Sequence, residues 1–175
     1  LLIPYESPPF VDETLNVLGW PDSRILRANH GMYQVSELVV PSFPDRRPAD
    51  FEWLREEILE NAPSHIPDSA NNVYVSRANG VERRVVNEDG VMEVLSEYGF
   101  ERYLLEERSL AENARLFADA NIIIGPHGAG LTDILFAKDG ALIELFGEKI
   151  KPPYEELSDA IGVEYEPMYC QAESA

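Results

Sequence analysis

The arrangement of apolar and polar positions changes along the chain, and from residue 46 onward it alternates between two periods. Short apolar runs at 73–76, 103–105, 122–124 and 141–145 indicate strands. Between them, apolar residues recur every three or four positions at 48–59, 87–98, 109–120 and 131–136, which favours helices. This alternation predicts an α/β fold, a Rossmann-like and mostly parallel sheet with helices on both faces.

Residues with known preferences for helix ends support these helices. Pro48 suits the first position of a helix, where no backbone N–H is needed. Asn87 is placed to cap the next helix and Gly99 to end it. Ser109 and Glu112 form a capping-box pattern at the start of the third.

The first 45 residues have a different pattern. Residues 1–4 are apolar, 11–18 have helical spacing before Gly19, and 35–40 read as a strand. A proline-rich stretch from Pro41 to Pro48 follows, as expected at a boundary. We therefore divide the chain into residues 1–45 and a Rossmann-like unit at 46–175. Because the chain starts at Leu1 rather than Met, we expect it to be a truncated or processed piece.

Charge narrows the classes of partner. The net charge is −18, with only three lysines against eleven arginines. This composition is that of an ordinary acidic cytosolic protein or of a halophilic one, whose acidic surface keeps it soluble in concentrated salt. Nucleic acid and anionic membranes are not expected as partners, since both attract basic surfaces. We expect a cytoplasmic location, including the inner face of a membrane, and the sequence leaves homo-oligomerisation open.

Membrane spans, disulfides and metals have little support. No run of 18 apolar residues occurs, so no transmembrane segment is expected. Cys170 is the single cysteine, which excludes an intrachain disulfide framework and a cysteine-based zinc site. The three histidines, His30, His65 and His127, are too scattered for a metal-binding pattern. We expect no cofactor and no metal.

The segment 125–133 carries the first candidate site. A strand ends at Gly125-Pro126, and His127, Gly128, Ala129, Gly130, Leu131 and Thr132 then lead into a helix. Free N–H groups at such a turn and the positive end of the helix dipole bind anions, which suggests a phosphate-bearing ligand. The alternative is that the glycines serve only tight packing, and that His127 is structural or merely exposed.

Arginines form the second candidate site. Arg77 follows a predicted strand, and Arg83, Arg84, Asn87 and Glu88 precede or begin the next helix. Ligands of open α/β sheets bind beyond the carboxyl ends of the strands, and guanidinium groups bind phosphate through two parallel hydrogen bonds. Alternatively, the arginines are surface residues paired with Glu82 and Glu88.

Glu144, near the end of a predicted strand, is the third candidate. Its carboxylate is placed to accept hydrogen bonds from a ribose diol, or else to be solvated or paired with Lys149. The signatures of serine hydrolases, P-loop proteins, zincins and dinucleotide-binding folds do not occur. Hydrolase, kinase and dinucleotide-binding functions therefore lack support.

Taken together and in this order, these motifs resemble glycosyltransferase family 61, which includes capsular polysaccharide biosynthesis proteins. Three blocks carry the resemblance: 75–88, 117–132 with the sequence His127-Gly-Ala-Gly-Leu-Thr132, and 136–146. Residues 11–45 also resemble the stretch that precedes these motifs in the family. The match covers most of the chain, and the spaced blocks are more specific than any one of them.

The resemblance implies the C-terminal, donor-binding lobe of a GT-B glycosyltransferase that inverts the anomeric centre and usually needs no metal. Arg77 and Arg83 would neutralise the donor diphosphate, and residues 127–131 would wrap it. Asn87 and Glu88 would support that pocket, and Glu144 would line the nucleotide pocket. The implied partners are a nucleotide sugar and a glycan or glycoconjugate acceptor, in capsular or other surface polysaccharide synthesis.

Two departures accompany the resemblance. Asp133 stands where many members have Asn or another neutral residue, and the family's upstream motif of a histidine and an acidic residue has no counterpart. Residues 1–45 would then be the tail of a largely missing first lobe, and the catalytic base stays unassigned. Two other readings remain open: a non-catalytic module that binds a nucleotide or nucleotide sugar, and an α/β interaction domain without a ligand.

Overall fold

The computed structural model describes residues 1–40, 47–67, 69–147 and 153–171. Its centre is a five-stranded, fully parallel sheet in the order β4-β3-β5-β6-β7. The strands are β3 (Asn72–Val75), β4 (Phe100–Tyr103), β5 (Ile122–Pro126), β6 (Ala141–Phe146) and β7 (Glu164–Tyr169). The predicted α/β fold with a parallel sheet is confirmed.

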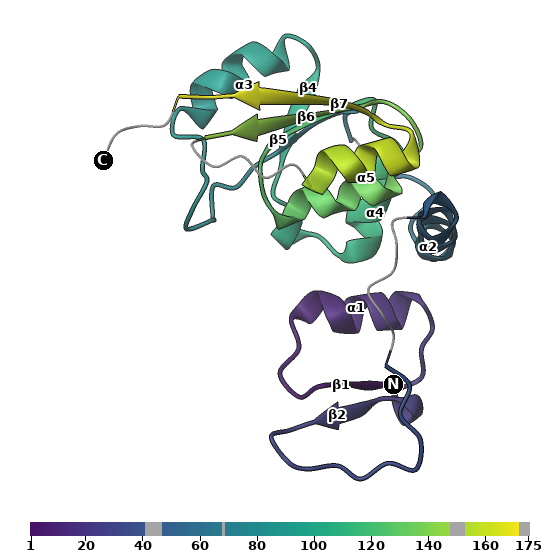
Figure 1. Ribbon diagram of the computed structural model, residues 1–175. Helices are drawn as coiled ribbons and strands as arrows, with labels where there is room; N and C mark the ends of the chain where they lie inside the picture. Colours follow the sequence, from purple (N-terminus) through teal and green to yellow (C-terminus); the bar gives the residue numbers. More distant parts are fainter. Residues whose placement is uncertain (41–46, 68, 148–152, 172–175) are drawn as a thin grey trace.

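Helices cover both faces of this sheet (Figure 1). Helix α3 (Glu88–Ser96) packs on one face, where Tyr74, Phe100, Ile124 and Leu145 form a small buried cluster. Helices α2 (Pro48–Glu60), α4 (Leu110–Ala118) and α5 (Pro153–Ile161) lie on the other face over the larger core. Alternation along each strand separates the two cores: Val73 and Val75 face the larger one, whereas Tyr74 faces α3.

The predicted helix ends are partly confirmed. Pro48 begins α2, and Ser109 and Glu112 form the capping box of α4, with the Ser109 hydroxyl accepting from the Glu112 backbone N–H. Asn87 precedes α3, but its side chain makes no capping hydrogen bond. Gly99 has φ +76°, the left-handed conformation that ends a helix at low cost in glycine.

The N-terminal residues form a smaller unit with its own sheet. Strands β1 (Leu2–Pro4) and β2 (Leu26–Ala28) pair in parallel, joined by α1 (Pro9–Val17) and the short 3₁₀ helix η1 (Asp22–Arg24). Val17 and Leu18 pack against the larger core, and the Glu13 carboxylate accepts a hydrogen bond of 3.2 Å from the Leu110 backbone N–H. This unit is thereby attached to α4.

Three predicted elements differ from the structure. Residues 35–40 form no strand and are exposed, because none of the described strands lies beside them to pair with. The strand expected at 103–105 lies at 100–103, directly after Gly99, and Leu105 begins the 3₁₀ helix η2 (Leu105–Glu107). The segment expected to be an α-helix at 131–136 is a 3₁₀ helix, η3 (Ala129–Phe136). The buried Leu131 and Ile134 within it, and Ala137 directly after it, are spaced three apart.

The order of the strands defines a topological switch point in the sheet. From β3 the chain crosses to β4 on one side and then returns to β5 on the other side of β3. The strand order therefore reverses between β3 and β5, and the loops after these two strands leave in different directions. In open α/β sheets this is where ligands bind, outside the carboxyl ends of the strands.

Candidate functional site

Arg77 and the turn after β5 meet at this reversal point. Arg77 follows the end of β3, and its guanidinium lies directly against the backbone of Gly128, two residues beyond the end of β5. Arg77 Nε is buried and has no hydrogen-bond partner in the described part of the chain. Buried guanidinium N–H groups are normally bonded, so this donor is unsatisfied within the described structure.

At each of the three glycines of the turn, a different neighbour leaves no room for a side chain. A Cβ at Gly125 would lie 2.9 Å from the Val75 Cβ, and one at Gly130 would lie 3.0 Å from the Leu105 Cδ1. These two glycines serve packing, as the alternative reading proposed. Gly128 differs, because a Cβ there would collide with the Arg77 guanidinium. Only Gly128 therefore keeps room for a charged group of the candidate site.

His127 is held from inside the protein. Its Nδ1 lies 2.5 Å from one oxygen of Glu144, and the Tyr165 hydroxyl donates to the other oxygen over 2.7 Å. Glu144 is completely buried, and its two carboxylate oxygens face His127 and Tyr165. The contact with a ribose diol stays a prediction, for a carboxylate that already has a protein partner at each oxygen. The alternative pairing with Lys149 concerns a residue outside those described.

Tyr154, on α5, joins the parts of the site. Its hydroxyl donates to the Gly128 carbonyl over 2.8 Å and lies 3.4 Å from the Thr132 hydroxyl. Its ring lies beside His127, with the centroids 5.8 Å apart. Burial raises the pKa of the Tyr154 phenol, and so does the charge of Glu144.

Two arginines also act on this phenol. The positive charges of Arg83 and Arg77 both lower the pKa of Tyr154, in opposition to its burial. Both guanidinium groups are therefore within electrostatic range of the ring that contacts His127 and Gly128. Arg77 thus contacts the turn at Gly128 directly, whereas Arg83 is linked to it only through the effect of its charge on Tyr154.

Arg83 stands in an unusual backbone conformation. Its φ is +59°, the one left-handed non-glycine residue in the described ranges. This conformation costs an L-amino acid about 1–2 kcal/mol, and such strain concentrates at functional sites. Within those ranges, no ion pair joins Arg77, Arg83 or Arg84 to a carboxylate, so the alternative pairing with Glu82 and Glu88 is not observed.

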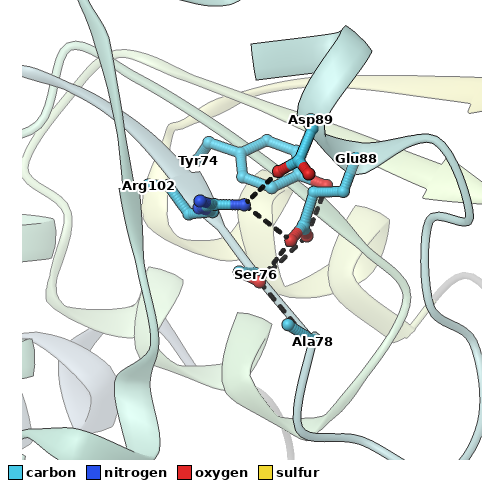
Figure 2. A network of polar contacts seen from close by, with 6 residues as sticks. All are labelled: Tyr74, Ser76, Ala78, Glu88, Asp89 and Arg102. Atoms are coloured by element: carbon cyan, nitrogen blue, oxygen red, sulfur yellow. Dashed lines mark hydrogen bonds and ion pairs between the residues drawn. The ribbon is translucent and has the colours of Figure 1, made fainter.

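The buried carboxylate of Glu88 pairs with Arg102 and not with Arg77, Arg83 or Arg84. Its carboxylate accepts hydrogen bonds from the Ser76 hydroxyl at 2.9 Å and the Tyr74 hydroxyl at 3.1 Å. Arg102 Nη1 lies 3.3 Å from the same carboxylate and 3.0 Å from Asp89 (Figure 2). Burial and the Glu88 charge raise the pKa of Tyr74, which stays a donor. The network ties the start of α3 to the end of β3, directly before Arg77.

The remaining predicted residues contribute less. Leu131 is buried in the core, whereas Ala129 and Thr132 are exposed on η3. Arg84 and Asn87 are exposed, and their side chains form no hydrogen bond with another described residue. Asn87 lines a shallow hollow on the outer side of α3. No hydrogen bond or ion pair among the described residues joins these two side chains to the turn.

Sequence reasoning missed Tyr154, Tyr165 and Phe146, which surround His127. The two tyrosines lie on α5 and β7, elements that were not predicted. A signal was present: Tyr154, Leu157 and Ile161 have helical spacing after Pro153, and Gly162 follows with φ +79°. Phe146 stacks on His127 with a centroid distance of 5.4 Å.

Two kinds of feature are absent from the described ranges. No group of three or more His, Cys, Asp and Glu side chains is arranged there to hold a metal ion. No helix in those ranges is both long enough and apolar enough to cross a bilayer.

Comparison with known proteins agrees with the motifs. Residues 4–143 match the family model described as Glycosyltransferase 61. The chain is also 33% identical over 96 residues to the Drosophila melanogaster protein named EGF domain-specific O-linked N-acetylglucosamine transferase. That alignment covers 53% of this chain and 18% of the fly protein. Because the family model covers most of its length, the chain belongs to glycosyltransferase family 61.

Proposed function

We propose that residues 46–175 form the donor-binding lobe of an inverting, metal-independent glycosyltransferase. In this proposal the diphosphate of a nucleotide sugar binds at the reversal point between β3 and β5. Residues 1–45 belong to the tail of a second lobe, and the transferred sugar enters a surface polysaccharide or glycoconjugate. The fly relative, an O-linked N-acetylglucosamine transferase by name, is consistent with a sugar donor.

One observation carries the proposal. Arg77 and Arg83 have no acidic partner among the described residues, in a chain with 32 acidic and 14 basic residues. Both act on Tyr154, which is bonded to Gly128 and lies beside His127. Positive groups that remain unpaired in so acidic a protein favour an anionic ligand.

The chemistry fits donor binding. When a nucleotide sugar reacts, negative charge grows on the departing nucleoside diphosphate. Fixed guanidinium groups and backbone N–H groups stabilise such charge without reorganising, and in this role they take the place of a metal ion. The acceptor hydroxyl also needs a general base, which we do not assign to any residue of this chain.

The test is thermal unfolding in concentrated KCl with a panel of nucleoside diphosphates and nucleotide sugars, with and without EDTA. A ligand at about a hundred times its dissociation constant stabilises by roughly 2.7 kcal/mol. A rise in Tm with one nucleoside diphosphate that EDTA leaves unchanged is expected. A rise that EDTA abolishes would contradict metal independence, and no rise with any ligand would contradict the donor site.

A second candidate is a non-catalytic module that binds the same nucleotide. It uses the same contact between Arg77 and Gly128 as the first candidate and differs from it only in turnover. An assay of turnover in the full-length protein separates the two functions. It measures the nucleoside diphosphate that is released when the bound donor is hydrolysed or its sugar is transferred. Binding without turnover in that protein would support the module.

A further inference from the structure

Three residues from three strands or their ends form a continuous chain of hydrogen bonds behind the candidate site. Tyr165 on β7 donates to Glu144 on β6, and Glu144 accepts from His127 after β5. Burying a carboxylate is costly unless its oxygens are bonded. Here each oxygen of the completely buried Glu144 has its own hydrogen-bond partner, which offsets the cost of burial.

In this series of hydrogen bonds Tyr165 acts as a donor. Burial raises the pKa of the Tyr165 phenol, and the hydrogen bond and charge of Glu144 raise it further. The phenol therefore keeps its proton and can only donate to the carboxylate. This bond fixes the plane of the Glu144 carboxylate, so that its other oxygen stays directed at His127.

Glu144 in turn determines which nitrogen of His127 carries hydrogen. With Glu144 as the acceptor of both hydrogen bonds, Nδ1 bears the hydrogen that lies between the ring and the carboxylate. Nε2, on the opposite side of the ring, then points away from Glu144. The side chain is 15% exposed, and within the described ranges no residue is hydrogen-bonded to Nε2. Phe146 and Tyr154 lie against the ring and limit its rotation.

We propose that Tyr165 and Glu144 are positioning residues that hold His127 in its Nδ1–H form and present Nε2 to the bound ligand. Histidines that bind metals are oriented by carboxylates in the same way. That the ligand is the diphosphate of a nucleotide donor rests on the function proposed above. The fixed tautomer does not rest on it and is tested without a ligand.

The experiment is ¹⁵N NMR of the histidine side chains in wild type, Glu144→Gln, Tyr165→Phe and Tyr169→Phe. With three histidines in the chain, the spectrum of His127→Gln identifies the His127 signals. Tyr169→Phe is the matched control. Like Tyr165→Phe, it removes one phenolic hydroxyl from β7. Tyr169, however, stacks on Phe146 and makes no hydrogen bond to Glu144. The affinity of each variant for nucleoside diphosphates is measured in parallel.

Wild type and Tyr169→Phe are expected to show His127 with hydrogen on Nδ1. Glu144→Gln should shift His127 toward the Nε2–H form, and Tyr165→Phe should give a mixture of the two forms. Tyr165→Phe should also weaken nucleotide binding about three- to tenfold, the range for a lost hydrogen bond. Because Glu144 is buried, Tyr165→Phe keeps the test valid if Glu144→Gln does not fold.

Two results would overturn the proposal. One is a wild-type protein with His127 in the Nε2–H form. The other is a Tyr165→Phe protein whose His127 spectrum matches that of Tyr169→Phe. If wild type bound no nucleoside diphosphate, the donor function would fail, while the spectra would still decide whether Tyr165 and Glu144 position His127.

Discussion

The guanidinium of Arg77 occupies the space in which a side chain at Gly128 would begin. The two residues are 51 positions apart in sequence and meet because β3 and β5 are neighbours in the sheet. The glycine in this turn is therefore a condition for the position of the arginine.

We expect Gly128→Ala to displace Arg77 and to weaken nucleoside diphosphate binding by about tenfold or more, as loss of a charge-assisted hydrogen bond does. Isothermal titration calorimetry measures this. Gly90→Ala is the control, because a Cβ there meets no atom within 4 Å and the position is helical. That control should bind normally and unfold at a slightly higher temperature. Equal affinity in both variants would contradict the role of Gly128.

Arg77→Ala is expected to reduce nucleotide affinity about tenfold or more, since it removes one charge-assisted contact worth roughly 1.5–3 kcal/mol. Arg84→Ala is the comparison, because Arg84 is adjacent to Arg83 but its charge is not among those that act on Tyr154. It should lose much less affinity. If Arg84→Ala were the more damaging change, the diphosphate would have to lie elsewhere.

Arg83→Gly separates binding from folding. Glycine adopts the φ of +59° without strain, which offsets its greater entropy in the unfolded chain. Unfolding in urea should therefore show a free energy within about 1 kcal/mol of wild type. Nucleotide affinity should still fall about tenfold, as for the loss of one charge-assisted hydrogen bond. A stable variant with unchanged affinity would remove Arg83 from the site.

Glu88→Gln should destabilise the fold by about 1–3 kcal/mol, because the buried amide cannot replace the charge-assisted bonds to Ser76, Tyr74 and Arg102. Asp89→Asn is the control. Asp89 contacts the same arginine, but its side chain is 93% exposed, so the loss should stay below about 1 kcal/mol. Urea unfolding compares them, and similar losses would mean that burial of Glu88 contributes little.

The raised pKa of Asp133 should make the free energy of unfolding depend on pH. Burial raises the pKa of its carboxyl from 3.8 to about 7. Between these values the folded protein retains a proton that the unfolded chain has released, so this residue lowers stability as pH rises through that window. Above about pH 7 the effect is complete, and below about pH 4 it is absent.

Asp133→Asn should therefore gain stability over wild type at pH 8 but not at pH 4. Urea unfolding at both values checks this, with the exposed Asp139→Asn as control. Parallel pH profiles for wild type and Asp133→Asn would show that the Asp133 carboxyl does not couple to folding.

Sequence patterns predicted the central part of the fold because its strands are buried on both faces. The apolar runs before Arg77 and before Gly125 gave two neighbouring strands, and the motifs after them gave the site. The pattern failed at 35–40, where an apolar run has no strand beside it in the described structure. A β-strand forms only where a neighbouring strand accepts and donates its backbone hydrogen bonds, and an apolar run in the sequence does not show whether such a neighbour exists.

The partners of Glu144 were also beyond reach of local patterns. A carboxylate near a strand end reads as a ligand contact, and only the fold shows that Tyr165 and His127 fill its two oxygens. Tyr165 lies outside the matched family region at 4–143, and β7 has mixed polarity as an edge strand. Such a hydrogen bond between neighbouring strands depends on register, which a one-dimensional pattern does not fix.

The parallel order of the central sheet has a consequence for the time course of folding. Every pairing among its five strands joins segments separated by a crossover, so chain entropy must be lost before these contacts form. The anion site draws on the ends of β3, β5 and β6 and is complete only when these strands have assembled. A nucleotide added during refolding should therefore leave the folding rate unchanged and slow only the rate of unfolding.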